Sequence, residues 1–127
     1  MILGMVEILA EALVFAEKSD LGTKNLNEFI QLMFPHSPFS AYSQRMLAGA
    51  YAPVGSDRPG FQIDLARKDA KHALDLAENC GARLEVVEVM DRHLEAAKRI
   101  GGDNMDISST YGTLRKDAGL RFSKDIE

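Results

Sequence analysis

The first 18 residues are apolar on almost every side of a helix, and this constrains the fold more than any other feature. Only Glu7 and Glu11 interrupt the apolar sequence over residues 1–16. These carboxylates argue against a signal peptide, which has a basic start and an unbroken apolar stretch, and against a membrane span of about 20 apolar residues. A helix that is apolar all round has to be covered by other helices or by a second subunit. We therefore expect a soluble domain in which this helix is buried nearly all round.

The same helix has no cap at its start. No Ser, Thr, Asp or Asn precedes Met1-Ile2-Leu3, although these are the residues that usually begin a helix. We therefore expect the chain to start inside an element whose first part is missing.

Glycine and proline divide the rest of the chain into five further helical segments. Between these breaks, apolar residues recur at three- and four-residue spacing, as they do on one face of an amphipathic helix. Thr23 and Ser37 stand where N-cap residues are expected, and Gly22 and Gly81 stand where helices end. The predicted helices span residues 1–18, 23–34, 38–48, 63–78, 83–100 and 107–116.

No stretch shows the convincing alternation of apolar and polar residues that a strand requires. The pattern predicts an all-α fold, a compact bundle of about six helices. Only residues 51–60, with two prolines and two glycines, read as a real loop. We expect one domain over residues 1–118 and a loose tail over residues 119–127.

Composition excludes several classes of function. The 127 residues carry 15 basic and 19 acidic side chains, with an isoelectric point near 5.4, so no basic field attracts nucleic acid. The single cysteine, Cys80, rules out an internal disulfide and favours a reducing compartment, the cytoplasm or an organellar matrix. His36, His72 and His93 lack the spacing of metal ligands, and no phosphate-binding glycine loop or G-x-S-x-G motif is present. On its own residues, the chain lacks a complete catalytic apparatus.

One acidic residue breaks the pattern of its helix. On a helix over residues 63–78, Asp69 lies between Leu76 and Ala73 on the apolar side. A carboxylate aimed at a core or a cleft costs free energy unless another group pairs with it. Asp69 therefore needs a structural or functional partner.

Two explanations for Asp69 are open from the residues alone. In the first, Asp69 accepts hydrogen bonds from a neighbouring helix terminus or pairs with an arginine such as Arg45, while Lys68 is solvated surface. In the second, the helix lines a cleft and presents Phe61, Lys68 and Asp69 to a ligand or to a domain outside this chain.

The segment around Asp69 resembles the C-terminal helical domain of the 3-hydroxyisobutyrate dehydrogenase-like enzymes, the β-hydroxyacid dehydrogenases related to 6-phosphogluconate dehydrogenase. The family pattern P-G-F-x-[IL]-D-L-x-x-K-D, with an A-L-x-L-A continuation, matches residues 59–69 and 73–77. Residues 11–18 resemble the family's E-A-L-x-L-A-x-K, and Arg45-Met46-Leu47 resembles its [PR]-M-L. The likeness covers residues 1–118.

The resemblance implies a use for the three residues of the second explanation. Family members combine a Rossmann domain, a long interdomain helix and a helical domain, with the active site in the cleft between them. They oxidise β-hydroxyacids, or reduce the matching aldehydes and keto acids, with NAD or NADP. By position, Lys68 reaches the nicotinamide end of the cofactor, and Phe61 and Asp69 form part of the cleft wall.

The resemblance also implies that essential parts lie outside this chain. The dinucleotide-binding loop and the substrate-anchoring Ser-Gly pair belong to the Rossmann domain, and the catalytic lysine of K-x-x-x-N would fall a few residues before Met1. We therefore expect the isolated chain to be inactive, with a Rossmann domain of the same enzyme, a small hydroxyacid substrate and a second copy in a homodimer as partners. A non-enzymatic helical dimerisation or binding module is the alternative. The loop over residues 52–58 also looks longer than is usual before P-G-F.

Overall fold

The computed structural model describes residues 1–51 and 59–123. Their regular structure is helical, apart from an isolated bridge between Gln62 and Asp106. This confirms the all-α prediction, and the predicted helix boundaries agree with the structure to within about two residues. The long loop noted in the sequence, residues 52–58, lies outside the described residues. The elements are α1 (Ile2–Lys18), α2 (Thr23–Met33), α3 (Pro38–Leu47), α4 (Ile63–Asn79), α5 (Glu85–Gly101), the 3₁₀ turn η1 (Ile107–Ser109) and α6 (Thr110–Asp117).

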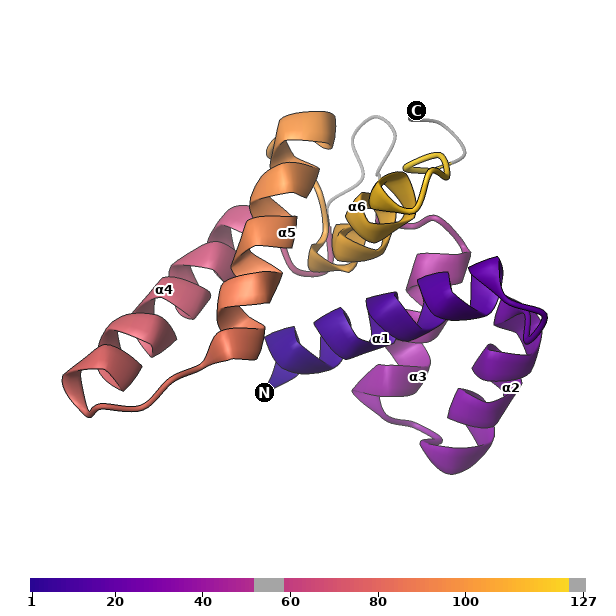
Figure 1. Cartoon of the computed structure of the whole chain (residues 1–127), viewed down its shortest axis with the longest axis horizontal. Helices are drawn as coiled ribbons and strands as arrows, with labels where there is room; N and C mark the ends of the chain where they lie inside the picture. Colours follow the sequence, from indigo (N-terminus) through magenta and orange to yellow (C-terminus); the bar gives the residue numbers. More distant parts are fainter. Residues whose placement is uncertain (52–58, 124–127) are drawn as a thin grey trace.

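Helix α1 lies at the centre of the molecule and contacts α2, α3, α5 and α6 (Figure 1). Leu9 and Leu13 are buried in the main core together with Met90 and Leu94 of α5. The opposite side of α1 remains exposed at Ile8 and Phe15. The first helix is therefore covered on one side by this chain, and the expectation that it is buried nearly all round does not hold within the chain itself.

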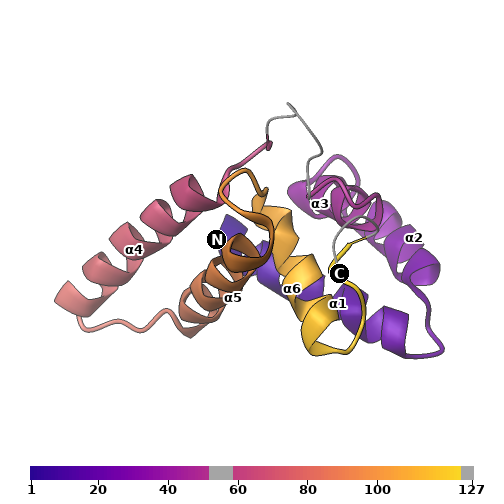
Figure 2. The ribbon, with the colours of Figure 1, turned by 90° about the horizontal axis from the view of Figure 1, so that it is seen from above.

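Helices α4 and α5 form a hairpin at one edge of the molecule, and α2 and α3 lie at the other edge (Figure 2). Two ion pairs join the helices of the hairpin. Arg67 Nε lies 2.8 Å from Asp91 Oδ1, and Lys98 Nζ lies 2.7 Å from Asp64 Oδ1. The main helical neighbour of α4 is α5, so the rest of the α4 surface faces outward.

Helices α2 and α3 pack on each other and on α1. Ser37 caps α3 as predicted, because its Oγ accepts a hydrogen bond from the Ser40 N–H at 3.4 Å. The predicted cap of α2 is wrong. Thr23 is the first helical residue, and the cap position belongs to Gly22, whose φ of 74° is the left-handed conformation that glycine adopts without strain.

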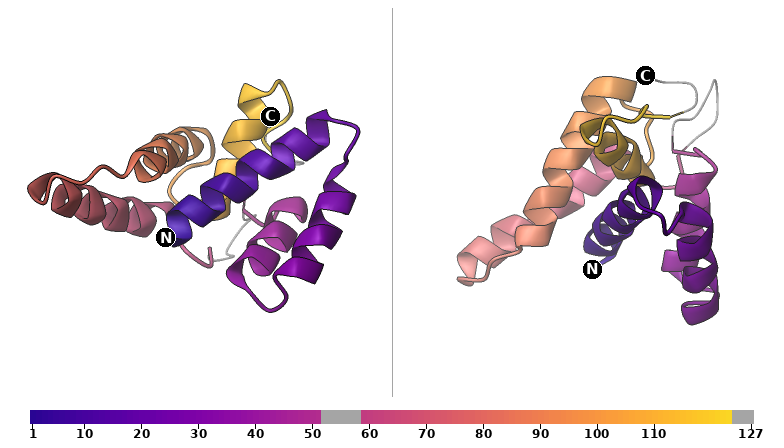
Figure 3. Two further views of the ribbon diagram at one scale, coloured as in Figure 1. Left: turned by 60° about the horizontal axis from the view of Figure 1, so that its bottom comes forward. Right: turned by 45° about the vertical axis from the view of Figure 1, so that its right-hand side comes forward.

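The residues after α6 return to the core, beside the C-terminal end of α1 (Figure 3). Phe122 is fully buried and packs edge-to-face on Tyr51, with ring centroids 5.8 Å apart. The Tyr51 hydroxyl donates a hydrogen bond of 2.6 Å to the carbonyl oxygen of Phe122. The segment expected from the sequence to be a loose tail is therefore anchored at Phe122, and residues 124–127 lie outside the described residues.

Candidate functional site

The P-G-F segment, Pro59 with Gly60 and Phe61, leads directly into α4 and is held by hydrogen bonds to residues just before and at the start of η1. Phe61 O accepts from the Ile107 N–H at 2.9 Å, and the Ile63 N–H donates to Met105 O at 3.0 Å. The Phe61 ring is partly buried against the core. The start of α4 is thus tied to a segment that lies more than 40 residues further along the chain.

Asp106 is the centre of this connection, and its side chain is fully buried. Its Oδ2 accepts hydrogen bonds from Arg45 Nη1 at 2.7 Å and from the Phe61 N–H at 2.9 Å. Its Oδ1 accepts from the N–H and the hydroxyl of Ser108, at 3.0 and 2.5 Å. A buried carboxylate is tolerated when a cation and several donors satisfy it, and Asp106 has both.

The sequence pattern did not reveal Asp106 as part of this site. The available signal was the Asp-Ile-Ser order at residues 106–108, which is typical of an N-cap and correctly marks the start of a helical turn. That signal gives no hint of Arg45 or Phe61, which come from distant segments. Arg45, proposed from sequence as a partner for Asp69, pairs with Asp106 instead.

The glycine of the P-G-F segment is explained by Arg45. A Cβ atom on Gly60 would lie 2.2 Å from Arg45 Nη1, which is closer than such atoms approach in proteins. The guanidinium also lies over the ring of Tyr42, 5.7 Å from its centroid. Ala41, Tyr42, Arg45 and Gly60 line a hollow of about 190 Å³ beside this contact. Burial, and then the nearby charge of Asp106, raise the pKa of the Tyr42 hydroxyl.

The structure brings Lys68 and Asp69 together on the outside of α4. Lys68 Nζ lies 3.4 Å from Asp69 Oδ1, and the two side chains are 57% and 56% exposed. An ion pair this exposed adds little to stability. Asp69 therefore does not point into the core of this chain, and the suggested pairing with Arg45 is wrong, because Arg45 pairs with Asp106. Phe61, the third predicted site residue, packs against the core instead of pairing with these two.

Asp69 is exposed because α5 covers a narrower face of α4 than the apolar residues of α4 occupy. The buried positions of α4 are Ile63, Ala66, Ala70 and Ala77. Leu65 and Leu76, which lie next to Asp69 around the helix on the side away from Ala73, are 50% and 68% exposed. Asp69 thus lies beside two leucines and a lysine on a surface that the described part of the chain leaves uncovered.

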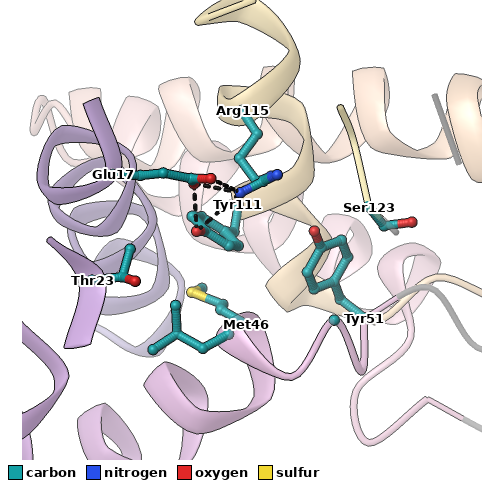
Figure 4. A pocket seen from close by; sticks show the side chains of 9 residues that line it. Glu17, Thr23, Met46, Tyr51, Tyr111, Arg115 and Ser123 are labelled. Carbon is teal, nitrogen blue, oxygen red and sulfur yellow. Dashed lines mark hydrogen bonds and ion pairs between the residues drawn. The ribbon is translucent and has the colours of Figure 1, made fainter. Parts of the chain in front are cut away.

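A second group of polar side chains joins the ends of α1 and α6 around a hollow of about 180 Å³ (Figure 4). Arg115 contacts both carboxylate oxygens of Glu17, and the Tyr111 hydroxyl donates to Glu17 at 2.9 Å. Burial raises the pKa of Tyr111 to about 12, so its hydroxyl stays protonated near neutral pH. Every charge in this group has a partner within it, which fits a structural connection between the two helices.

Glu7 of α1 is a buried acid whose partner comes from α5. Its Oε1 lies 2.6 Å from His93 Nδ1, while Oε2 has no hydrogen-bond partner among the described residues. Burial raises the pKa of the Glu7 carboxyl, against the opposing attraction of His93 and Arg92 and together with repulsion from Glu11. His93 is therefore bound to a buried carboxylate, which the sequence pattern did not predict.

The described residues hold neither a candidate metal site nor a candidate membrane-spanning helix. Over residues 1–51 and 59–123, no group of three or more His, Cys, Asp or Glu side chains is placed to hold a metal ion. In the same part of the chain, no helix has both the length and the apolar character that a membrane crossing requires.

Comparison with known proteins identifies the family. The model of a family described as "NAD-binding of NADP-dependent 3-hydroxyisobutyrate dehydrogenase" matches residues 1–114. The chain belongs to this family. The match confirms the resemblance drawn from the P-G-F segment, and it supports an NAD-binding, dehydrogenase-like domain.

Three curated relatives are oxidoreductases by name. The NADH-dependent oxidoreductase ucdB of Aspergillus ustus is 31% identical over 127 residues, which cover all of this chain and 44% of that protein. The uncharacterized oxidoreductase YfjR of Bacillus subtilis is 26% identical, over 84% of this chain and 35% of that protein. An uncharacterized oxidoreductase of Shewanella frigidimarina is 33% identical, over 91% and 38%. This chain thus spans less than half the length of these relatives.

Proposed function

We propose that this chain is the helical domain of an NAD- or NADP-dependent β-hydroxyacid dehydrogenase. It supplies one wall of the cleft between itself and a Rossmann domain, and it contributes to the oligomer interface. The observation that carries the proposal is the family match over residues 1–114, which includes the P-G-F segment and Lys68. Its placement beside a Rossmann domain agrees with the chain spanning 44% of the Aspergillus relative.

The outer face of α4 fits one end of a dinucleotide. Lys68 offers an exposed ammonium group whose observed ion pair is a weak surface contact with its neighbour Asp69. Leu65 and Leu76 provide apolar surface beside it. A bound NAD or NADP supplies the hydride acceptor. Lys68 can donate a charge-assisted hydrogen bond to the cofactor, and Asp69 can orient Lys68 from the adjacent position.

The residues proposed to form the cleft wall also need rigid support, and the core and helix α5 provide it. Phe61 rests against the buried residues at the start of α4, and the α4–α5 hairpin is fastened by the Arg67–Asp91 and Lys98–Asp64 pairs. An active site works best when its side chains stand on rigid elements. In this proposal Phe61 closes the cleft at the level of the substrate, and Lys68 lies further along α4.

The proposal is tested by joining the chain to the Rossmann domain of a family member and assaying oxidation of a panel of small β-hydroxyacids with NAD and with NADP. We expect activity in the joined protein and none in the chain alone. Lys68→Ala should raise the cofactor KM by about tenfold or more, the loss of one charge-assisted hydrogen bond. Lys71→Ala, an exposed lysine on the same helix, is the matched control and should leave the KM unchanged.

Two results would contradict the proposal. An inactive joined protein that still forms a defined dimer favours the non-enzymatic dimerisation module. Equal effects of Lys68→Ala and Lys71→Ala remove Lys68 from the cofactor site and leave only a general contribution of positive charge.

A further inference from the structure

The Asp106–Arg45 ion pair contacts the P-G-F segment, and we call these two side chains the clamp. Arg45 Nη1 and the Phe61 N–H both donate to the same oxygen of Asp106, at 2.7 and 2.9 Å. The guanidinium also fills the space where a Gly60 side chain would be. The cation, the carboxylate and the backbone of the segment are therefore in mutual contact.

The clamp acts on the first residues of α4. The hydrogen bonds from Ile107 N–H to Phe61 O and from Ile63 N–H to Met105 O continue the contact on both sides of Asp106. Helix α4 begins at Ile63, so Lys68 follows five residues later, about 7.5 Å along the helix axis. Because a helix transmits a displacement of its first turn along its length, the position of the Lys68 ammonium depends on the clamp.

We propose that Asp106, together with Arg45, is a positioning residue of the dehydrogenase site, and this rests on the function proposed above. Asp106 touches neither substrate nor cofactor. It sets the path of the P-G-F segment, and through it the place of Phe61 and Lys68 in the cleft wall. The buried carboxylate is suited to this role because, among the described residues, its hydrogen bonds all come from donors: the Arg45 guanidinium, the Phe61 and Ser108 N–H groups and the Ser108 hydroxyl.

Asp106→Asn is the informative variant because it keeps the size of the side chain. In either orientation, the new NH₂ group faces at least one backbone N–H, of Phe61 or of Ser108, and two donors cannot form a hydrogen bond. Glu17→Gln is the matched control. It makes the same carboxylate-to-amide change in an ion pair with an arginine, at the α1–α6 connection, and Glu17 makes no hydrogen bond to the P-G-F segment among the described residues.

The first measurement is hydrogen–deuterium exchange in the 127-residue chain. In Asp106→Asn, the amides of residues 61–69 should lose protection by about tenfold or more relative to the rest of the chain. In Glu17→Gln, any loss should appear in α1 and α6 and should leave residues 61–69 protected. Equal loss over residues 61–69 in both variants would mean general destabilisation and would overturn the proposal.

The second measurement is a split between KM and kcat in the active joined enzyme. Asp106→Asn should raise the cofactor KM by about fivefold or more with a smaller effect on kcat, while a Glu17→Gln enzyme of similar melting temperature keeps the parental KM. If Asp106→Asn is too unstable to purify, Arg45→Lys keeps a cation near Asp106 and should shift the KM in the same direction. An unchanged KM in an active parent background overturns the positioning role alone. A parent with no activity overturns the proposed function, and the positioning role with it.

Discussion

The contact between Gly60 and Arg45 gives a prediction that can be worked out from the structure. Gly60 is not among the glycines with positive φ, so its backbone accepts alanine, and only the space around it opposes the substitution. A Cβ atom would lie 2.2, 2.8 and 2.9 Å from Nη1, Nη2 and Cζ of Arg45. The guanidinium would have to retreat by more than about 1 Å to restore van der Waals contact. Because Nη1 is the atom that bonds to Asp106, we expect that retreat to lengthen or break the 2.7 Å contact.

The expected cost follows from what remains around Asp106. Removing one partner of a fully buried ion pair costs about 3–5 kcal/mol when the other charge is left uncompensated, and the 36% exposure of the Arg45 side chain lowers that cost here. Asp106 keeps the donors of Phe61 and Ser108, so we expect Gly60→Ala to lower the free energy of unfolding by about 2–3 kcal/mol. In an Arg45→Ala background the collision is gone, and the same substitution should cost less than about 0.5 kcal/mol.

The assay is a double-mutant cycle measured by urea unfolding, followed by the helical circular dichroism signal. Four proteins suffice: the parent, the two single variants and the double variant. The interaction term should equal most of the cost of Gly60→Ala alone. An equal cost in both backgrounds, or a cost under about 0.5 kcal/mol in the parent, would refute the explanation of this glycine by Arg45.

Three other predictions concern the core and the surface. Because burial raises the pKa of Glu7 above its ordinary 4.5, the folded state holds the proton more tightly, so the free energy of unfolding should fall as the pH rises above that value. Glu7→Gln should flatten this dependence in urea unfolding at a series of pH values, and an unchanged slope would assign it to another group. Phe122→Ala should cost about 3–4 kcal/mol by chemical denaturation, whereas a cost near zero would restore the expectation of a loose tail. Leu76→Ser should change the unfolding free energy of the isolated chain by less than about 0.5 kcal/mol, since this side chain is exposed, and a larger loss would indicate that a second copy already covers it.

The helices could be predicted from the sequence because their signals are local. Gly22 and Gly81 adopt positive φ where the sequence places helix ends, and Ser37 caps the helix that follows it. The P-G-F segment and its lysine could be identified because the family pattern is contiguous. What these signals share is that each is read within a few neighbouring residues.

The clamp and the exposure of Asp69 could not be predicted, for two different physical reasons. Asp106 is satisfied by Arg45 and Phe61, whose distances along the chain are 61 and 45 residues, and no local pattern encodes such pairings. For Asp69, the helical periodicity gives its position around α4, but it does not give how wide a face of α4 is covered by α5. The buried positions of α4 are Ile63 and three alanines, so the covered stripe is narrow and does not include Asp69.

The packing of α1 against α6 has a consequence for how the chain is made. Lys18 of α1 donates to the carbonyl oxygen of Ala118, a hundred residues later, and Glu17 of α1 forms an ion pair with Arg115 of α6. At about 5–20 residues per second, a ribosome needs roughly 5–20 s to add that length of chain. During this time the most apolar helix of the protein has emerged without the partner that covers much of it. A chaperone that holds apolar helices should therefore engage the nascent chain at α1, and synthesis of α6 should release it.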